Sequence, residues 1–246
     1  MLHIGKYFGY IGHGAIRILG YVPGINKYLK NKEDFTLEER YNHARLRVDD
    51  VLHNILRVKL QINGYDKIKD EDTCLFIPNH QSMIDPLCLI HLFKDPTIVV
   101  SKKEAKKMPV VGKIIDLIDG IYLDRESPRD ALRMYKECNK HLLENRDVII
   151  FAEGTRSKDS EVNIGTYKPG AFKCAYKTGA KIVPVVFDES YRPLSITKKN
   201  NKEKIVKISF LDPIDSKEYE KLNTTELATL VETRAKEELA RLRTNS

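Results

Sequence analysis

The stretch CLFIPNHQSMIDPLCLIHLF, residues 74–93, places a strand, a turn and a helix in direct succession. Its first five residues form a short apolar run, which is typical of a buried strand. The segment that follows Asp85-Pro86 is again largely apolar, and it begins with residue types that favour a helix start. Strand, turn and helix in this order open a β-α-β unit, so the stretch predicts an α/β fold.

The chain around this stretch continues the alternation. Strands are predicted at 57–62, 74–78, 97–100, 120–123, 148–152, 181–187 and 204–210, and helices at 86–93, near 102–118, 128–145, 170–177 and 224–242. This spacing favours a largely parallel central sheet flanked by helices, in one α/β domain over residues 57–246. In such sheets ligands bind beyond the carboxyl ends of the strands.

Residues 1–56 are predicted to form a separate N-terminal segment, an amphipathic hairpin of two helices. The first 32 residues contain no acid, and the apolar residues from Ile4 to Val22 share one face of a helix that breaks at Pro23-Gly24. A second helix is expected from Thr36 to about Leu56, because Thr36 and Glu39 have the spacing of a capping box. A basic amphipathic helix favours a membrane interface, although packing on the core explains the same pattern. We expect a monotopic segment that lies on the membrane and does not span it.

The net charge of +7 suits an anionic partner, namely nucleic acid, an anionic membrane or a phosphorylated substrate. No nucleic-acid-binding motif accompanies the charge, so we expect no nucleic acid partner. The four cysteines are scattered without a C-x-x-C spacing, which predicts neither a disulfide framework nor a zinc site. We expect buried thiols in a reducing compartment, no metal and no bound cofactor.

The turn within the opening stretch holds His80 and Asp85, five positions apart. On one continuous helix these side chains would point about 140° apart, whereas a strand end, a turn and a helix start would let the carboxylate fold back to the imidazole. Such an aspartate fixes the tautomer of a histidine general base and stabilises the imidazolium that forms. The alternative is structural: Asp85 caps the helix and His80 is a loop residue.

Three more polar segments lie near the ends of predicted strands: SKKEAKKMPVVGK (101–113), GIYLDRES (120–127) and FAEGTRS (151–157). Each has a structural explanation, namely a solvated helix face, an ion pair of Arg125, and a strand-exit turn with a solvated arginine. The functional alternative for the third segment is a phosphate or hydroxyl site. There Gly154 would permit close approach of the backbone and Arg156 would donate hydrogen bonds.

Together and in this order, the motifs resemble the glycerolipid acyltransferases, in particular the 1-acyl-sn-glycerol-3-phosphate (lysophosphatidic acid) acyltransferases. The matches are Asn79–Asp85 with N-H-x-x-x-x-D, Lys102–Glu104 with K-x-E, Gly120–Arg125 with a second block, Phe151–Ser157 with F-P-E-G-T-R-S, and Val183–Val185 with V-P-V. The resemblance covers residues from about 70 to 190. Ala152 stands where the family usually has proline.

The resemblance implies an activity, acyl transfer from a thioester to the sn-2 hydroxyl of lysophosphatidic acid, giving phosphatidic acid without an acyl-enzyme. His80 and Asp85 would be the general base and its orienting carboxylate. The substrate-binding residues would be Lys102, Arg125 and Arg156 at the phosphate, Gly120 of the second block, and Glu153, Gly154 and Thr155 at the glycerol end. The donor would be a thioester of acyl carrier protein or coenzyme A. The enzyme would be peripheral, on the cytoplasmic face of the cell membrane.

Three other interpretations stay open. Within the family, the acceptor could be glycerol 3-phosphate or another lysophospholipid. A hydrolase would use Ser82 as nucleophile with His80, although residues two apart rarely face each other and a G-x-S-x-G elbow is absent. A non-catalytic basic module would bind acidic lipids or nucleic acid through its lysines, but it would not need the ordered motifs.

Overall fold

A seven-stranded sheet forms the centre of the computed structural model, which describes residues 14, 16–69, 71–154, 163–194 and 204–244. The strand order is β1-β7-β6-β2-β5-β3-β4. The strands are β1 Val58–Asn63, β2 Cys74–Pro78, β3 Ile98–Lys102, β4 Ile121–Leu123, β5 Val148–Ile149, β6 Lys181–Asp188 and β7 Lys204–Phe210. Neighbouring strands in this order are parallel, except that β6 and β7 are antiparallel. The predicted largely parallel sheet is confirmed.

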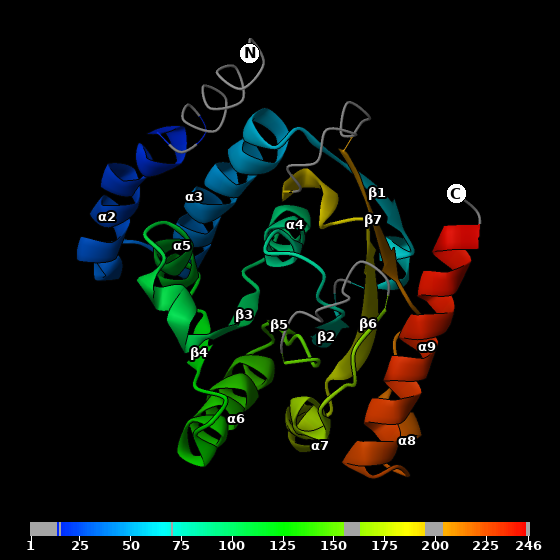
Figure 1. Cartoon of the computed structure of the whole chain (residues 1–246). Helices are drawn as coiled ribbons and strands as arrows, with labels where there is room; N and C mark the ends of the chain where they lie inside the picture. The colour runs from blue at the N-terminus through cyan, green and yellow to red at the C-terminus, as the bar shows by residue number, and fades with distance from the viewer. Residues whose placement is uncertain (1–13, 15, 70, 155–162, 195–203, 245–246) are drawn as a thin grey trace.

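Two layers of helices cover the sheet, with α2–α5 on one face and α6, α7 and α9 on the other (Figure 1). The helices are α2 Val22–Lys30, α3 Leu37–Asp49, α4 Asp85–Leu92, α5 Val111–Leu117, α6 Pro128–Leu143, α7 Lys173–Thr178, α8 Ser216–Tyr219 and α9 Thr224–Thr244. Because side chains alternate along a strand, Leu75 and Ile77 of β2 pack under α6, α7 and α9, while Cys74 and Phe76 pack under α2–α5. The predicted flanking helices are therefore confirmed.

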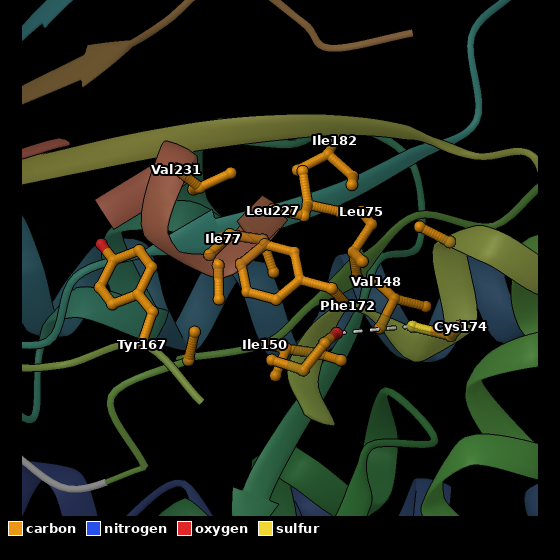
Figure 2. Close-up of a cluster of buried hydrophobic side chains, with 14 of the residues drawn as sticks. Leu75, Ile77, Val148, Ile150, Tyr167, Phe172, Cys174, Ile182, Leu227 and Val231 are labelled. Atoms are coloured by element: carbon orange, nitrogen blue, oxygen red, sulfur yellow. Dashed lines mark hydrogen bonds between the residues drawn. The ribbon is translucent and has the colours of Figure 1, made fainter. Parts of the chain in front are cut away.

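One hydrophobic cluster lies between the sheet and α9 and contains the fully buried Phe172. Figure 2 shows side chains from the sheet and from α9 around this ring, among them Leu75, Ile182, Leu227 and Val231. Burying a side chain of this size contributes about 1.5–3 kcal/mol. Tyr167 belongs to the same cluster, so the segment from Tyr167 to Phe172 is anchored to the core.

The lysine-rich segment after β3 is not the single helix that the sequence predicts. A short 3₁₀ turn, η4 Lys103–Lys107, is followed by extended backbone at Met108, and only then does α5 begin. The physical reason is Pro109, because a proline disfavours helical geometry at the residue before it.

The second N-terminal helix begins as predicted and changes from α-helical to π-helical before its end. The capping box is confirmed: the Glu39 N–H donates to Thr36 Oγ1 at 3.2 Å, and the Thr36 N–H donates to Glu39 Oε2 at 2.8 Å. After Asp49 the α-helix gives way to a π-helical turn, η2 Asp50–Ile55. The predicted extent of the helix, from Thr36 to about Leu56, is therefore confirmed, and its last part is π-helical.

The break in the first helical segment lies earlier than the sequence predicts. Residues 16–19 are helical, a turn follows at Gly20-Tyr21, and Pro23 lies in the first turn of α2. Proline is tolerated there because the N–H groups of a first turn have no partner within the helix. The predicted apolar face before residue 14 lies outside the described residues.

Helices α2 and α3 pack on α4 and α5 and share one hydrophobic cluster with the sheet, through residues such as Ile25, Tyr41 and Val48. The division of the chain at residue 56 stays a prediction. Among the helices in the described ranges, none combines the length and the apolar character needed to cross a bilayer.

Candidate active site

The imidazole of His80 and the carboxylate of Asp85 meet at the carboxyl end of β2. His80 lies in the turn after the strand, Asp85 is the first residue of α4, and His80 Nδ1 is 2.8 Å from Asp85 Oδ2. The predicted contact across the turn is confirmed. The His80 side chain is 17% exposed and that of Asp85 is fully buried. The ring also packs on Phe151, with 4.3 Å between ring centroids.

The Asp85 carboxylate accepts three hydrogen bonds on one oxygen. Besides the ring nitrogen, the N–H groups of Gln81 and Ser82 donate to Oδ2 at 2.7 and 2.8 Å. An oxygen held by two backbone donors acts as an acceptor towards the ring, so we assign the ring proton to Nδ1. The lone pair of a neutral imidazole is then on Nε2, which makes no hydrogen bond to any described residue. This is the arrangement that a general base requires.

Two side chains on either side of His80 fix the loop to the end of β6. Asn79 donates from Nδ2 to the Phe187 carbonyl at 3.1 Å, and its Oδ1 accepts the Phe187 N–H at 2.7 Å. Gln81 Oε1 accepts from the N–H and the hydroxyl of Ser190, at 3.3 and 3.4 Å. These anchors preorganise the dyad. The sequence did not predict their role, because Phe187 and Ser190 are more than 100 residues away along the chain.

Glu153 connects the dyad loop to a third segment. Its Oε1 accepts the backbone N–H of His80 at 2.7 Å, and its Oε2 accepts that of Gly165 at 2.7 Å. Burial raises the pKa of Glu153, and the two N–H bonds act in the opposite direction. Both carboxylate oxygens thus have main-chain partners, so Glu153 positions the loops around His80. Its predicted contact with glycerol stays a prediction.

The turn that presents Glu153 forms without the proline that the family usually has. The Gly154 N–H donates to the Phe151 carbonyl at 3.1 Å, and the Ala152 carbonyl accepts the Lys168 N–H at 2.9 Å. Gly154 has φ +74°, a left-handed conformation that favours glycine. These two bonds hold the turn, which explains how alanine is accommodated at position 152. The predicted site residues Thr155 and Arg156 lie outside the described residues.

Lys102 and Arg125 lie near the same edge of the sheet as His80. Lys102 ends β3 and is paired in register with Leu123, the last residue of β4, and Arg125 follows two residues later. Because β2, β5, β3 and β4 are parallel, their carboxyl ends share this edge. Both cations are exposed, and neither forms an ion pair or hydrogen bond with a described residue. They are therefore available to an anionic ligand.

Gly120 does not reach this edge. The strand register places it beside Val99, which is level with Phe76 of β2. Along the direction of β2, His80 lies four residues beyond Phe76, which is about 13 Å at the usual rise of a strand. A Cβ at Gly120 would stand 2.6 Å from Ile115 Cγ2, so close packing requires the glycine here. Its predicted part in substrate binding has no support from this position.

The geometry gives no support to a serine nucleophile. Ser82 is buried, its N–H donates to Asp85, and its Oγ lies 3.5 Å from the Ile84 nitrogen with no hydrogen bond to His80. The four cysteines are buried free thiols. Within the described residues, no group of three or more histidine, cysteine or acidic side chains is arranged to hold a metal ion.

Comparisons with known proteins identify the family of this chain. The model of the Acyltransferase family matches residues 59–188. The chloroplastic 1-acyl-sn-glycerol-3-phosphate acyltransferase of Arabidopsis thaliana is 34% identical over 128 residues, which are 52% of this chain and 35% of that protein. An uncharacterized acyltransferase of Schizosaccharomyces pombe is 28% identical over 217 residues, 87% of this chain and 71% of that protein. The match thus spans about a third of the plant relative's length.

The fold has a counterpart among solved structures. The crystal structure of the 1-acyl-sn-glycerophosphate (LPA) acyltransferase PlsC from Thermotoga maritima is similar, with a TM-score of 0.70 and 22% sequence identity, over 95% of this chain and 93% of that one. At this identity the likeness concerns the fold. Since the family model matches more than half of the 246 residues, this protein belongs to the acyltransferase family, which confirms the resemblance carried by the sequence motifs.

Proposed function

We propose that this protein transfers an acyl group from a thioester to the sn-2 hydroxyl of lysophosphatidic acid, giving phosphatidic acid. The observation that carries the proposal is the His80–Asp85 contact of 2.8 Å, in which the carboxylate is held by two backbone N–H groups and Nε2 is left without a partner among the described residues. The Arabidopsis and Thermotoga proteins, whose names give the same acceptor, support this choice of substrate.

The dyad supplies the proton transfers that the reaction needs. An alcohol is a weak nucleophile at neutral pH, so Nε2 of His80 takes the proton of the acceptor hydroxyl as its oxygen attacks the thioester carbonyl carbon. The carbonyl electron pair moves onto oxygen and returns as the carbon–sulfur bond breaks. The departing thiolate takes the proton from the imidazolium. The products are an ester and a free thiol, and no covalent acyl-enzyme forms.

Asp85 makes these steps possible in two ways. Its bond to Nδ1 holds the ring so that Nε2 faces away from the loop, and its negative charge offsets the positive charge of the imidazolium. Because the side chain is fully buried, water does not compete for that bond. The anchors at Asn79, Gln81 and Glu153 keep the ring in place between the two proton transfers.

Cations beyond the strand ends bind the acceptor's phosphate in this proposal. Lys102 and Arg125 are exposed and unpaired among the described residues near the dyad's edge. Arg156 is assigned to the same phosphate by its motif, and Gly154 and Thr155 to the glycerol end. Arginine suits a phosphate because its planar guanidinium donates two parallel hydrogen bonds. The donor is a thioester of acyl carrier protein or coenzyme A, both anionic.

The protein is proposed to act as a peripheral, monotopic enzyme at the cytoplasmic face of the cell membrane. The helical residues before α2 expose Ile16 and Leu19, which are 71% and 54% accessible, next to a net basic segment. Exposed apolar side chains on a basic helix favour a lipid interface, where the amphipathic acceptor resides. The free thiols suit a reducing compartment. Flotation with anionic vesicles tests the membrane association.

The activity is tested with purified protein, detergent-solubilised lysophosphatidic acid and either acyl-coenzyme A or acyl carrier protein thioester. Phosphatidic acid is the expected product. The His80→Ala variant should fold normally and retain less than about a hundredth of the turnover, because positioned proton transfer contributes about 10²–10⁴-fold. Glycerol 3-phosphate and other lysophospholipids are assayed in parallel. Acylation of one of these in place of lysophosphatidic acid would reject the proposed acceptor but keep the reaction.

A further inference from the structure

Lys168 is an exposed lysine whose backbone is fixed next to the dyad loop. Its N–H donates to the Ala152 carbonyl at 2.9 Å, and its own carbonyl accepts the Ala171 N–H at 3.0 Å. Four residues later, Phe172 is fully buried in the core. Both backbone groups of Lys168 are therefore bonded, and the side chain starts from a defined position beside the turn that presents Glu153.

The Lys168 side chain runs across Gly154. A Cβ at Gly154 would stand 3.0 Å from Lys168 Cε and 3.1 Å from its Nζ. Any side chain at position 154 would crowd the lysine, so the glycine is what makes room for it. The ammonium group thus lies beside Gly154, and the preceding residue, Glu153, accepts the backbone N–H of His80 with its carboxylate.

Among the residues that the structure describes, the Lys168 ammonium has no acidic partner. Glu153, the residue before Gly154, uses Oε1 for the His80 N–H and Oε2 for the Gly165 N–H, and Lys168 makes no ion pair with any described residue. Here both backbone groups of Lys168 are bonded, and no described residue neutralises the charge of its side chain. A cation placed in this way beside a proposed active site is suited to bind an anionic group of a substrate.

We propose that Lys168 binds a phosphate group of a substrate and thereby adds a further cation to those that the motifs predict. The inference rests on the proposed function, because the acyl acceptor carries a phosphate and coenzyme A carries several. The position over Gly154, in the motif that the resemblance assigns to the acceptor, favours the acceptor's phosphate.

The experiment compares Lys168→Met, Lys168→Arg and the control Lys177→Met with the unmodified protein. Methionine keeps an unbranched side chain over Gly154 and removes the charge, and arginine keeps the charge. Lys177 is an exposed lysine of α7 without an ion pair to any described residue. The KM for each substrate and kcat are measured, together with calorimetric titrations of lysophosphatidic acid, monoacylglycerol and coenzyme A. Thermal melting checks that each variant folds.

Lys168→Met should raise the KM for lysophosphatidic acid about tenfold, the lower range for a hydrogen bond to a charged group, with kcat preserved. Monoacylglycerol binding should not change, arginine should restore most of the loss, and Lys177→Met should behave as wild type. A rise in the KM for acyl-coenzyme A instead would assign the phosphate to the donor.

The proposal is overturned if Lys168→Met binds lysophosphatidic acid and coenzyme A as the unmodified protein does, or if the unmodified protein binds neither. The titrations need no turnover, so they decide the role of Lys168 even if phosphatidic acid is not formed. In that case the proposed function fails separately.

Discussion

Replacing Asp85 by Asn tests whether the negative charge of the dyad, and not only its shape, drives the reaction. The asparagine amide is nearly the same size as the carboxylate. Its oxygen should occupy the place of Oδ2, where the N–H groups of Gln81 and Ser82 and the ring N–H of His80 all point at an acceptor. The hydrogen bonds are thereby kept and the charge is lost.

The size of the effect follows from the distance between the charges. With an Nδ1 to Oδ2 distance of 2.8 Å, the charge centres of imidazolium and carboxylate are about 4 Å apart, which gives about 4 kcal/mol at an effective dielectric constant of about 20. Losing that attraction lowers kcat by about a thousandfold. The amide nitrogen falls where Oδ1 is, a buried position without a hydrogen-bond partner, and this costs about 1–3 kcal/mol of stability.

The assay measures kcat for phosphatidic acid formation at saturating substrates, with urea unfolding in parallel. Asp49→Asn is the matched control, because His91 Nδ1 and Asp49 Oδ1 form another histidine–aspartate pair, at 2.5 Å between α4 and α3. That variant should keep its kcat. If folded Asp85→Asn protein retained more than about a tenth of the wild-type kcat, the charge-based account of the dyad would be refuted.

Three further changes have defined outcomes. Arg125→Ala should raise the KM for lysophosphatidic acid about tenfold without changing stability, and an equal loss with monoacylglycerol would contradict the phosphate assignment. Gly154→Ala should cost about 1–2 kcal/mol in urea unfolding, because φ is +74° there, and unchanged stability would show that the turn relaxes. Burial raises the pKa of Asp147 to about 6, so the folded state holds a proton that the unfolded state loses above the ordinary value of 3.8. The contribution of Asp147 to stability is therefore full below pH 3.8 and is lost as pH rises through 6, by about 3 kcal/mol. Asp147→Asn keeps the acceptor for the Cys74 N–H, and should be more stable than wild type at pH 7 but not at pH 3.5. Parallel urea curves at both pH values check the sign.

Local patterns in the sequence were sufficient where the interacting groups are close along the chain. The capping box at Thr36 and the contact of His80 with Asp85 were both predicted from spacing, because they join residues three and five apart. The apolar stripe did not distinguish an α-helical from a π-helical turn at Asp50–Ile55. The single helix expected after β3 was wrong for a local reason, because Pro109 disfavours helical geometry at Met108.

The candidate site shows the same division. The motifs identified His80, Asp85 and Glu153, yet the partners of Glu153 were not predictable, because a bond to the His80 backbone joins positions 73 residues apart. Gly120 belongs to a matching motif, but the strand register places it away from the edge. Lys168 lies in no motif used for the prediction. It became a candidate for phosphate binding only because the structure places its side chain over Gly154.

The sequence by itself determined the alternation of strands and helices, the two-faced burial of β2, and the strand–turn–helix that joins His80 to Asp85. These features depend on the periodicity of apolar residues and on turn chemistry, which act over a few residues. Only the tertiary structure decided which strands are neighbours, that β7 runs against β6, and which loops meet around the imidazole. Those choices depend on how distant surfaces pack together, and that packing leaves no periodic signal in any single segment.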